Sequence, residues 1–156
     1  MSVEPARIWH LPRLLGILWQ ATRGMGPVAR ARHEDVCALG GLIWRRKVLV
    51  WRAGGRLRGF LARDGVRLHA LYVCPGWRGQ GAGAALLASA QSESARLELF
   101  TATDNCGAQR FYGRHGFQVL RSGVGQGNDE GIADLFLAWE CPQLLALIAA
   151  PRWGLS

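Results

Sequence analysis

The feature that most constrains the fold is a glycine-rich turn between an apolar run and a helix-forming run. Strand-forming residues fill positions 66–74, and positions 82–90 are rich in good helix formers. The turn between them is Arg78-Gly79-Gln80-Gly81-Ala82-Gly83. Glycines let a backbone approach a ligand closely, and the N-terminus of a helix attracts phosphate oxygens. The turn therefore predicts a strand–turn–helix unit with a site for phosphate.

Two other kinds of turn were compared with the sequence: a P-loop and an ordinary strand-to-helix turn. A phosphate-binding P-loop requires Lys followed by Ser or Thr after the glycine at position 81. Ala82 and Gly83 stand there, so the P-loop is excluded. An ordinary strand-to-helix turn remains open, because glycine is common at turns.

A dinucleotide-binding fingerprint matches the bare pattern. Gly79, Gly81 and Ala84 satisfy G-x-G-x-x-A, and Glu98 lies near the distance of a ribose-binding acid. The context opposes it, because residues 75–77 separate the strand from the turn and Glu98 falls in the middle of a predicted strand. Too little chain remains for a doubly wound sheet.

The remaining patterns predict an α/β fold with a mixed central sheet, an antiparallel N-terminal meander and flanking helices. The chain has 156 residues, which suits a single domain spanning 1–156. Helical spacing covers Pro12–Arg23 and the run from Val36 to Ile43. The other predicted elements are strands at 48–52, 59–63 and 66–74, a helix at 82–90, a strand at 96–101, a helix at 105–115 and strands at 117–121 and 132–140.

Charge and cysteine content narrow the classes of ligand. The net charge is +8, nearly all from arginine, with Lys47 the only lysine. The arginines are scattered along the chain, so we expect no nucleic acid as the main ligand, although a basic surface also suits a ligand with several phosphates. The four cysteines form no Cys-x-x-Cys pair, and we expect free thiols and no metal.

Hydropathy predicts a cytoplasmic protein without a membrane span. No window reaches the roughly 18 consecutive apolar residues of a membrane helix. Prolines and charges interrupt the apolar residues at the N-terminus, unlike a signal peptide. Residues 141–156 form an apolar C-terminal extension, which we expect either to pack back on the domain or to join a second subunit in a homodimer.

A second motif lies downstream of the glycine turn. The sequence from Asn105 to Phe117 reads Asn-x-x-Ala-x-x-Phe-Tyr-x-x-x-Gly-Phe. Together with Arg-x-x-Gly-x-Gly after an apolar-x-Val strand end, it resembles the GNAT acetyltransferase superfamily. The resemblance covers residues 66–140. His69-Ala-Leu-Tyr-Val and Gly127-Asn-Asp-Glu130, followed by Ala133-Asp134, look like a bacterial subgroup with poorly defined acceptors.

The resemblance implies acetyl-coenzyme A as co-substrate and a primary amine as acceptor. In the superfamily, backbone groups of the fourth strand bind the pantetheine arm, the glycine turn binds the pyrophosphate, and the Asn of the second motif bonds the cofactor. Carried over to this chain, the cofactor-binding residues are Leu71, Tyr72, Val73, Arg78, Gly79, Gln80, Gly81, Ala82, Gly83, Asn105, Ala108 and Phe111.

Two catalytic residues are predicted. By resemblance, Tyr112 is the acid that protonates the leaving thiolate, and a purely packing role is its alternative. His69 has the same parity as Leu71 and Val73, so we expect it on their side of the strand, where an imidazole can accept an amine proton. An exposed histidine without a task is the alternative.

The acceptor stays open between a polyamine, an amino acid, an antibiotic and a protein amine. Asp129, Glu130 and Asp134 form an acidic cluster that can receive a cationic acceptor, or else a solvated polar loop. A non-catalytic acyl-coenzyme A sensor of the same fold is the alternative function.

Overall fold

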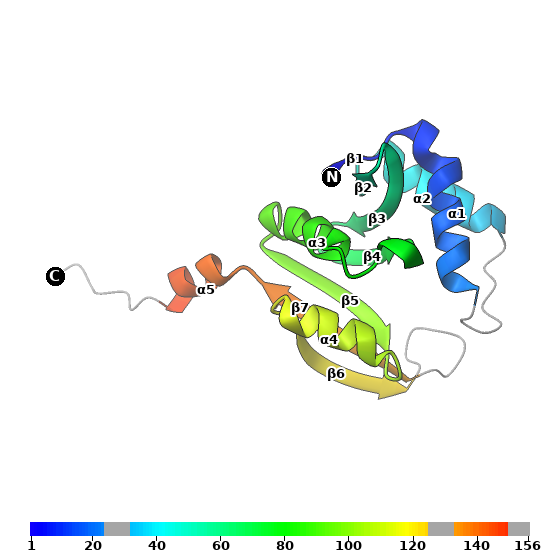
Figure 1. The fold of residues 1–156 in the computed structure, drawn as a ribbon. Helices are drawn as coiled ribbons and strands as arrows, with labels where there is room; N and C mark the ends of the chain where they lie inside the picture. Colours follow the sequence, from blue (N-terminus) through cyan, green and yellow to red (C-terminus); the bar gives the residue numbers. More distant parts are fainter. Residues whose placement is uncertain (24–31, 125–132, 150–156) are drawn as a thin grey trace. The chain divides into compact units, whose positions relative to one another are not determined.

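The computed structural model describes residues 1–23, 32–124 and 133–149 (Figure 1). Its contacts divide the chain into two compact units, Met1–Ser92 and Glu93–Ser156. None of the helices in the described ranges is both long and apolar enough to span a bilayer.

The first unit contains four antiparallel strands in the order β1-β2-β3-β4. They are β1 (Ser2–Pro5), β2 (Val48–Ala53), β3 (Arg56–Asp64) and β4 (Arg67–Val73). The turn after β2 contains Gly54 and Gly55 and the turn after β3 contains Gly65, all with positive φ. These left-handed positions favour glycine, which explains the sharp reversals between strands.

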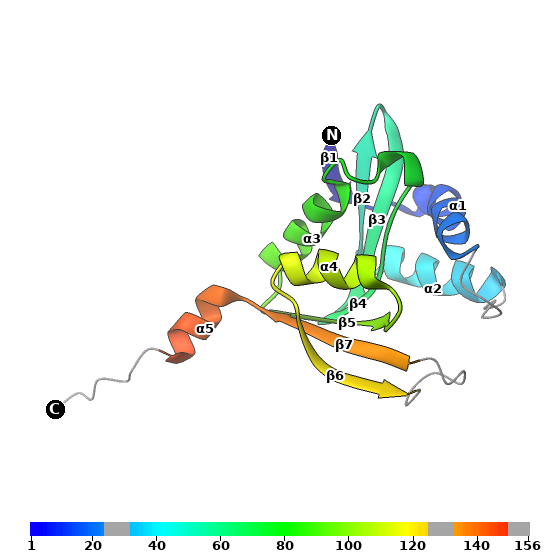
Figure 2. The same cartoon turned by 60° about the horizontal axis from the view of Figure 1, so that its bottom comes forward.

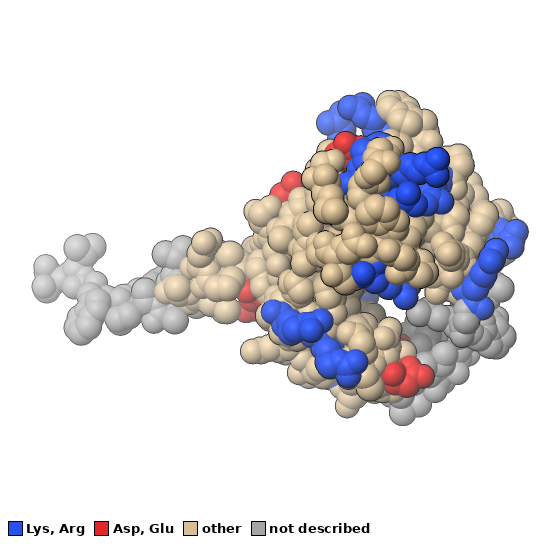
Figure 3. All heavy atoms as spheres, in the orientation of Figure 1, with Lys and Arg blue, Asp and Glu red and all other residues tan. Residues whose placement is uncertain are grey.

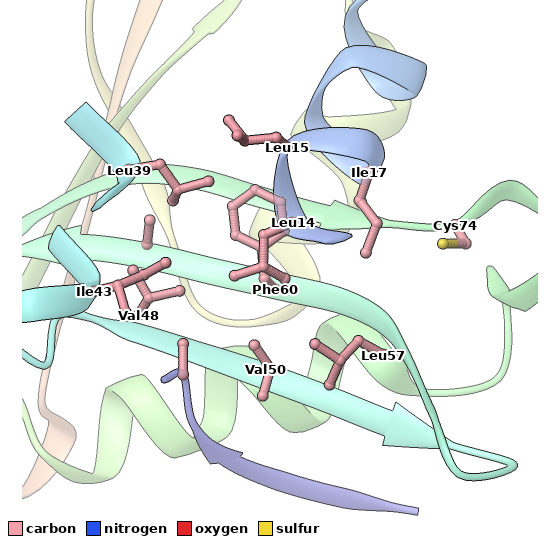
Figure 4. Packing of buried hydrophobic residues seen from close by; sticks show 12 residues of the cluster. Leu14, Leu15, Ile17, Leu39, Ile43, Val48, Val50, Leu57, Phe60 and Cys74 are labelled. Atoms are coloured by element: carbon pink, nitrogen blue, oxygen red, sulfur yellow. The ribbon is translucent and has the colours of Figure 1, made fainter. Parts of the chain in front are cut away.

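Helices cover both faces of these strands. Helices α1 (Leu11–Thr22) and α2 (Arg32–Trp44) lie on one face, and α3 (Ala82–Ser92) lies on the other (Figure 2). Leu14 of α1 and Phe60 of β3 are fully buried in the core between α1, α2 and the strands (Figure 4). Burial of such side chains contributes about 1.5–3 kcal/mol each.

The second unit contains three antiparallel strands in the order β5-β7-β6. They are β5 (Arg96–Ala102), β6 (Gln118–Val124) and β7 (Ala133–Glu140). Helix α4 (Cys106–Arg114) connects β5 to β6, and Gly116 ends it with a φ of 86°. Helix α5 (Pro142–Ala149) follows β7. Leu97, Leu99 and Leu137 are buried in this unit.

Every predicted helix and strand is present, with ends that differ by a few residues. The first strand, β1, was not predicted because it has only four residues and ends in proline, and its pairing with β2 stabilises it. The predicted apolar face at Val36 is wrong, since that side chain is exposed. The tail was predicted to be apolar, but its helix, α5, was not predicted.

Candidate functional site

The glycine-rich turn presents open backbone. It follows a short 3₁₀ helix, η2 (Pro75–Trp77), and leads into α3. Gly79 and Gly81 have φ values of 75° and 82°, and a Cβ built on either would have no atom within 4 Å. Space at the turn therefore faces outward from the protein, at backbone conformations that side chains rarely adopt.

The backbone donors of this turn have no partner among the described residues. Among the described residues, the N–H groups from Gly79 to Gly83 donate no hydrogen bond to another protein group. The turn ends at the N-terminus of α3, where the helix dipole is positive. Amides of this kind bind an anion such as a pyrophosphate.

Two side chains brace the turn. Arg78 donates from Nε to the carbonyl oxygen of Val73 at 3.1 Å, and Gln80 donates from Nε2 to that of Gly76 at 3.4 Å. The bond from Arg78 leaves its two terminal nitrogens available for an anion. Both side chains are exposed, as a ligand-binding role requires.

A bulge in β4 changes the predicted direction of His69. Ala62 pairs with Ala70, but Arg63 pairs with Leu68, so His69 is the extra residue on its strand. A bulge places two successive residues against one partner residue and breaks the alternation of faces. The predicted parity is therefore wrong: His69 lines a cavity together with Ala70 and Tyr72, and Leu71 and Val73 do not line it.

This cavity has a volume of about 400 Å³ and lies between α1, α2, β3 and β4. Its floor is apolar and includes Leu39 and Phe60, which are buried. Tyr72 lines the wall and packs against the ring of Phe60, with centroids 5.7 Å apart. Tyr72 was predicted to bind the cofactor, and that role stays a prediction. A cavity of this size suits a small ligand.

One carboxylate lining the cavity was not predicted. Asp35 of α2 accepts a hydrogen bond from Nε1 of Trp19 at 3.0 Å, and Arg32 lies 4.9 Å from the centroid of the Trp19 ring. In the sequence, Asp35 is an acid in the first turn of a helix, which the helix dipole alone explains. Only the packing of α1 on α2 shows that it borders a cavity.

In the second unit, Asn105 caps α4. Its Oδ1 accepts a hydrogen bond from the backbone N–H of Ala108 at 3.1 Å, as is usual for an asparagine N-cap. That bond fixes the orientation of the side-chain amide. In the described part of the chain its Nδ2 has no hydrogen-bond partner, so it stays available as a donor to a ligand.

Tyr112 is packed within the same unit. Its side chain is buried, and its ring contacts those of Phe111 and Phe117 edge to face, each with centroids 5.2 Å apart. These contacts fix the ring without involving its hydroxyl. Ala108, Phe111 and Tyr112 all lie on α4, so one helix holds this part of the predicted site.

The predicted acidic cluster is only partly described. Asp129 and Glu130 lie outside the described residues. Asp134 is a half-buried residue of β7, paired with Ala102 of β5 and Gly123 of β6.

The sequence is similar to known acetyltransferases. Residues 44–119 match the model of the acetyltransferase (GNAT) domain. Over 86 residues the chain is 37% identical to uncharacterized N-acetyltransferases of Mycobacterium bovis and Mycobacterium tuberculosis. The match covers 48% of this chain and 54% of each relative, so the chain spans about half the length of these curated relatives. The resemblance to the GNAT superfamily is confirmed.

Solved structures have the same fold. A GNAT-family acetyltransferase of Bacillus cereus has a TM-score of 0.72 at 20% identity, covering 89% of this chain and 96% of its own. A ribosomal-protein-alanine N-acetyltransferase of Brucella melitensis gives 0.73 at 21%, covering 90% and 100%. A putative acetyltransferase of Salmonella typhimurium, solved with its cofactor acetyl-coenzyme A, gives 0.71 at 19%, covering 90% and 93%. The predicted α/β fold with a mixed sheet and flanking helices is confirmed.

Proposed function

We propose that this chain, which carries a GNAT acetyltransferase domain in residues 44–119, transfers an acetyl group from acetyl-coenzyme A to a primary amine. The observation that carries the proposal is the glycine turn. Its amides have no hydrogen-bond partner among the described residues, and both left-handed glycines face open space. Unpaired amides occur at every helix N-terminus, and what sets this turn apart is the pair of left-handed glycines with open space beside them.

Donor binding is assigned to both motifs. The amides from Gly79 to Gly83 and the free nitrogens of Arg78 would hold the pyrophosphate. The backbone around Leu71 and Val73 would hold the pantetheine arm. On α4, Nδ2 of Asn105 would donate to the cofactor, beside Ala108 and Phe111. When bound, acetyl-coenzyme A supplies the acetyl group as a thioester.

The 400 Å³ cavity is the proposed acceptor site. Its apolar floor would hold the body of the acceptor. Asp35, which shares the lining with Arg23 and Arg32, would accept a hydrogen bond from the amine. His69 is exposed on the wall, with its imidazole accessible to a ligand. Because Asp129 and Glu130 are outside the described residues, their role toward the acceptor stays a prediction, as does that of Asp134.

In the proposed reaction one residue of the chain accepts a proton and another donates one. The amine nitrogen forms a bond to the thioester carbonyl carbon and the carbon–sulfur bond breaks. His69 accepts the proton that the amine loses. The hydroxyl of Tyr112 gives a proton to the departing thiolate, an uphill transfer of modest size since a phenol has a pKa of about 10 and a thiol about 8.5. The products are an acetamide and free coenzyme A.

Cellular location, domain extent and oligomeric state are also part of the proposal. We place the activity in the cytoplasm, as one domain over 1–156 with residues 141–156 as an extension. A homodimer through that extension stays a prediction.

A direct experiment is available. The purified chain is mixed with acetyl-coenzyme A and a panel of polyamines, amino acids, aminoglycosides and peptides, and free thiol and acetylated product are measured together. We expect thiol release that depends on the amine and matches the product in amount. Tight binding of acetyl-coenzyme A without turnover for any amine would favour a sensor.

A further inference from the structure

A second cavity, with a volume of about 580 Å³, lies at the β2–β3 hairpin of the first unit. It is bounded by the hairpin, by the short 3₁₀ helix η1 (Ile8–His10) and by the start of α1. No residue of the glycine turn lines it, and none of its described lining residues is acidic. Its lining consists of Trp9, His10, Arg13, Arg52, Gly55, Arg56 and Leu57.

Two of its three arginines are held in position. Arg52 donates to Glu4 Oε1 at 2.9 Å from Nη2 and to the carbonyl oxygen of Gly55 at 3.2 Å. Arg13 donates from Nε to the carbonyl oxygen of Leu57 at 3.3 Å. Arginines fixed in this way lose little side-chain entropy on binding an anion.

The third arginine is available. Arg56 is exposed at the start of β3, and in the described part of the chain its guanidinium makes no hydrogen bond or ion pair. Further positive charge lies beside the cavity, because the guanidinium of Arg7 is 5.3 Å from the ring centroid of Trp9, which lines it. Basic side chains gather over this end of the first unit (Figure 3). Arginines that are scattered along the sequence thus converge in the fold.

His10 adds a neutral donor. Burial, and then the charge of Arg52, lower the pKa of its imidazole, which favours the neutral ring. Its Nδ1 accepts a hydrogen bond from the backbone N–H of Arg7 at 3.1 Å. The neutral ring therefore carries its proton on Nε2, which can donate to an anion.

An aromatic surface completes the site. The indole of Trp9 lines the cavity and is 67% exposed. A large exposed aromatic residue beside arginines is a surface on which a nucleobase can stack, a contact measured at about 1–3 kcal/mol per base.

We propose that this cavity binds a nucleoside phosphate, at a site separate from the glycine turn. Arg13 and Arg56 bind the phosphate beside Arg52, which is ion-paired with Glu4 at 2.9 Å. His10 donates to the phosphate, and Trp9 stacks on the base. The volume of about 580 Å³ falls in the usual range of small-molecule sites. The inference does not depend on acetyl transfer.

Calorimetric titration with ADP tests the proposal. Wild type binds ADP, and Arg56→Ala weakens binding about 10- to 150-fold, as expected for losing a charge-assisted hydrogen bond of about 1.5–3 kcal/mol. Arg56 is exposed, so its replacement leaves the fold intact. Arg45→Ala is the matched control, since it removes the same charge from an exposed position before β2. Equal losses in both variants would reduce the effect to net charge and overturn the proposal.

Comparing ADP with inorganic phosphate distinguishes binding of the base from binding of the phosphate. Trp9→Ala should weaken ADP at least fivefold and leave the affinity for inorganic phosphate unchanged. Saturating coenzyme A should not displace ADP in wild type. The proposal is wrong if coenzyme A competes fully, because the arginines would then serve the cofactor. It is also wrong if a single-stranded oligonucleotide binds while ADP does not, since the ligand would then be a polymer.

Discussion

Replacing Gly81 by alanine tests the phosphate cradle at its centre. Gly81 has a φ of 82° and open space where its Cβ would be. The change therefore adds a methyl group at the surface where a pyrophosphate oxygen would lie. It also forces alanine into the left-handed region, at a cost of about 1–2 kcal/mol. A matched control must place alanine at a positive φ outside the glycine turn.

Gly65→Ala is such a control. Gly65 has a φ of 57°, its Cβ would also have no neighbour within 4 Å, and it lies in the turn between β3 and β4. Both variants should therefore lose about 1–2 kcal/mol without ligand. For a chain of this length that lowers the Tm by about 2–8 °C.

The two variants should differ once acetyl-coenzyme A is added. At 100 times the wild-type Kd, binding stabilises the folded state by about 2.7 kcal/mol, or about 5–11 °C. Losing hydrogen bonds to the charged pyrophosphate at about 1.5–3 kcal/mol each makes a hundredfold weaker Kd a reasonable expectation for Gly81→Ala. The remaining stabilisation is then about 0.4 kcal/mol, or about 1–2 °C.

Differential scanning fluorimetry with and without acetyl-coenzyme A measures both effects, and calorimetry gives the Kd directly. Gly65→Ala should keep the full ligand-induced shift while Gly81→Ala loses most of it. If the two variants show the same shift, the pyrophosphate does not lie at this turn.

Three further predictions follow from the site and from the first unit. Tyr112→Phe should lower acetyl transfer tenfold to a thousandfold with little change in Tm or in the Kd of acetyl-coenzyme A, because the packed ring is kept; an unchanged rate leaves a packing role. His69→Ala should lower kcat/KM about a hundredfold, whereas Asp35→Asn should mainly raise KM; the reverse result would make Asp35 the base. Since the pKa of His10 is lowered in the folded state, the unfolded state binds more protons below about pH 6.5, and urea unfolding of wild type should lose stability from pH 7.5 to 5.5 more than His10→Gln does.

The fold could be predicted from the sequence largely because the residues that form its turns and end its helices act locally. Glycines mark the hairpin turns, and Gly116 marks the end of α4. The strand β1 lacked such a signal, because its stability comes from pairing with β2, more than 40 residues away. The glycine turn between η2 and α3 was predictable for the same reason as the hairpins, since it depends on consecutive residues.

The cavity between α1, α2, β3 and β4 could not be predicted in the same way. Alternation along β4 gave the wrong direction for His69, because a bulge depends on the register with β3. Asp35 borders the cavity only because α1 packs on α2. The basic cavity brings Trp9 and Arg13, which are close in sequence, next to Arg56 of the β2–β3 hairpin, a proximity that no local pattern contains.

The measurement that tests the central claim most directly is amine-dependent turnover of acetyl-coenzyme A by the wild-type chain. Free thiol and acetylated amine are quantified in the same reaction, with Gly81→Ala at subsaturating cofactor as the matched negative. The account predicts equal amounts of both products for at least one class of amine, and a strongly reduced rate in the variant. Thiol release that needs no amine, or that is equal in both proteins, would contradict it.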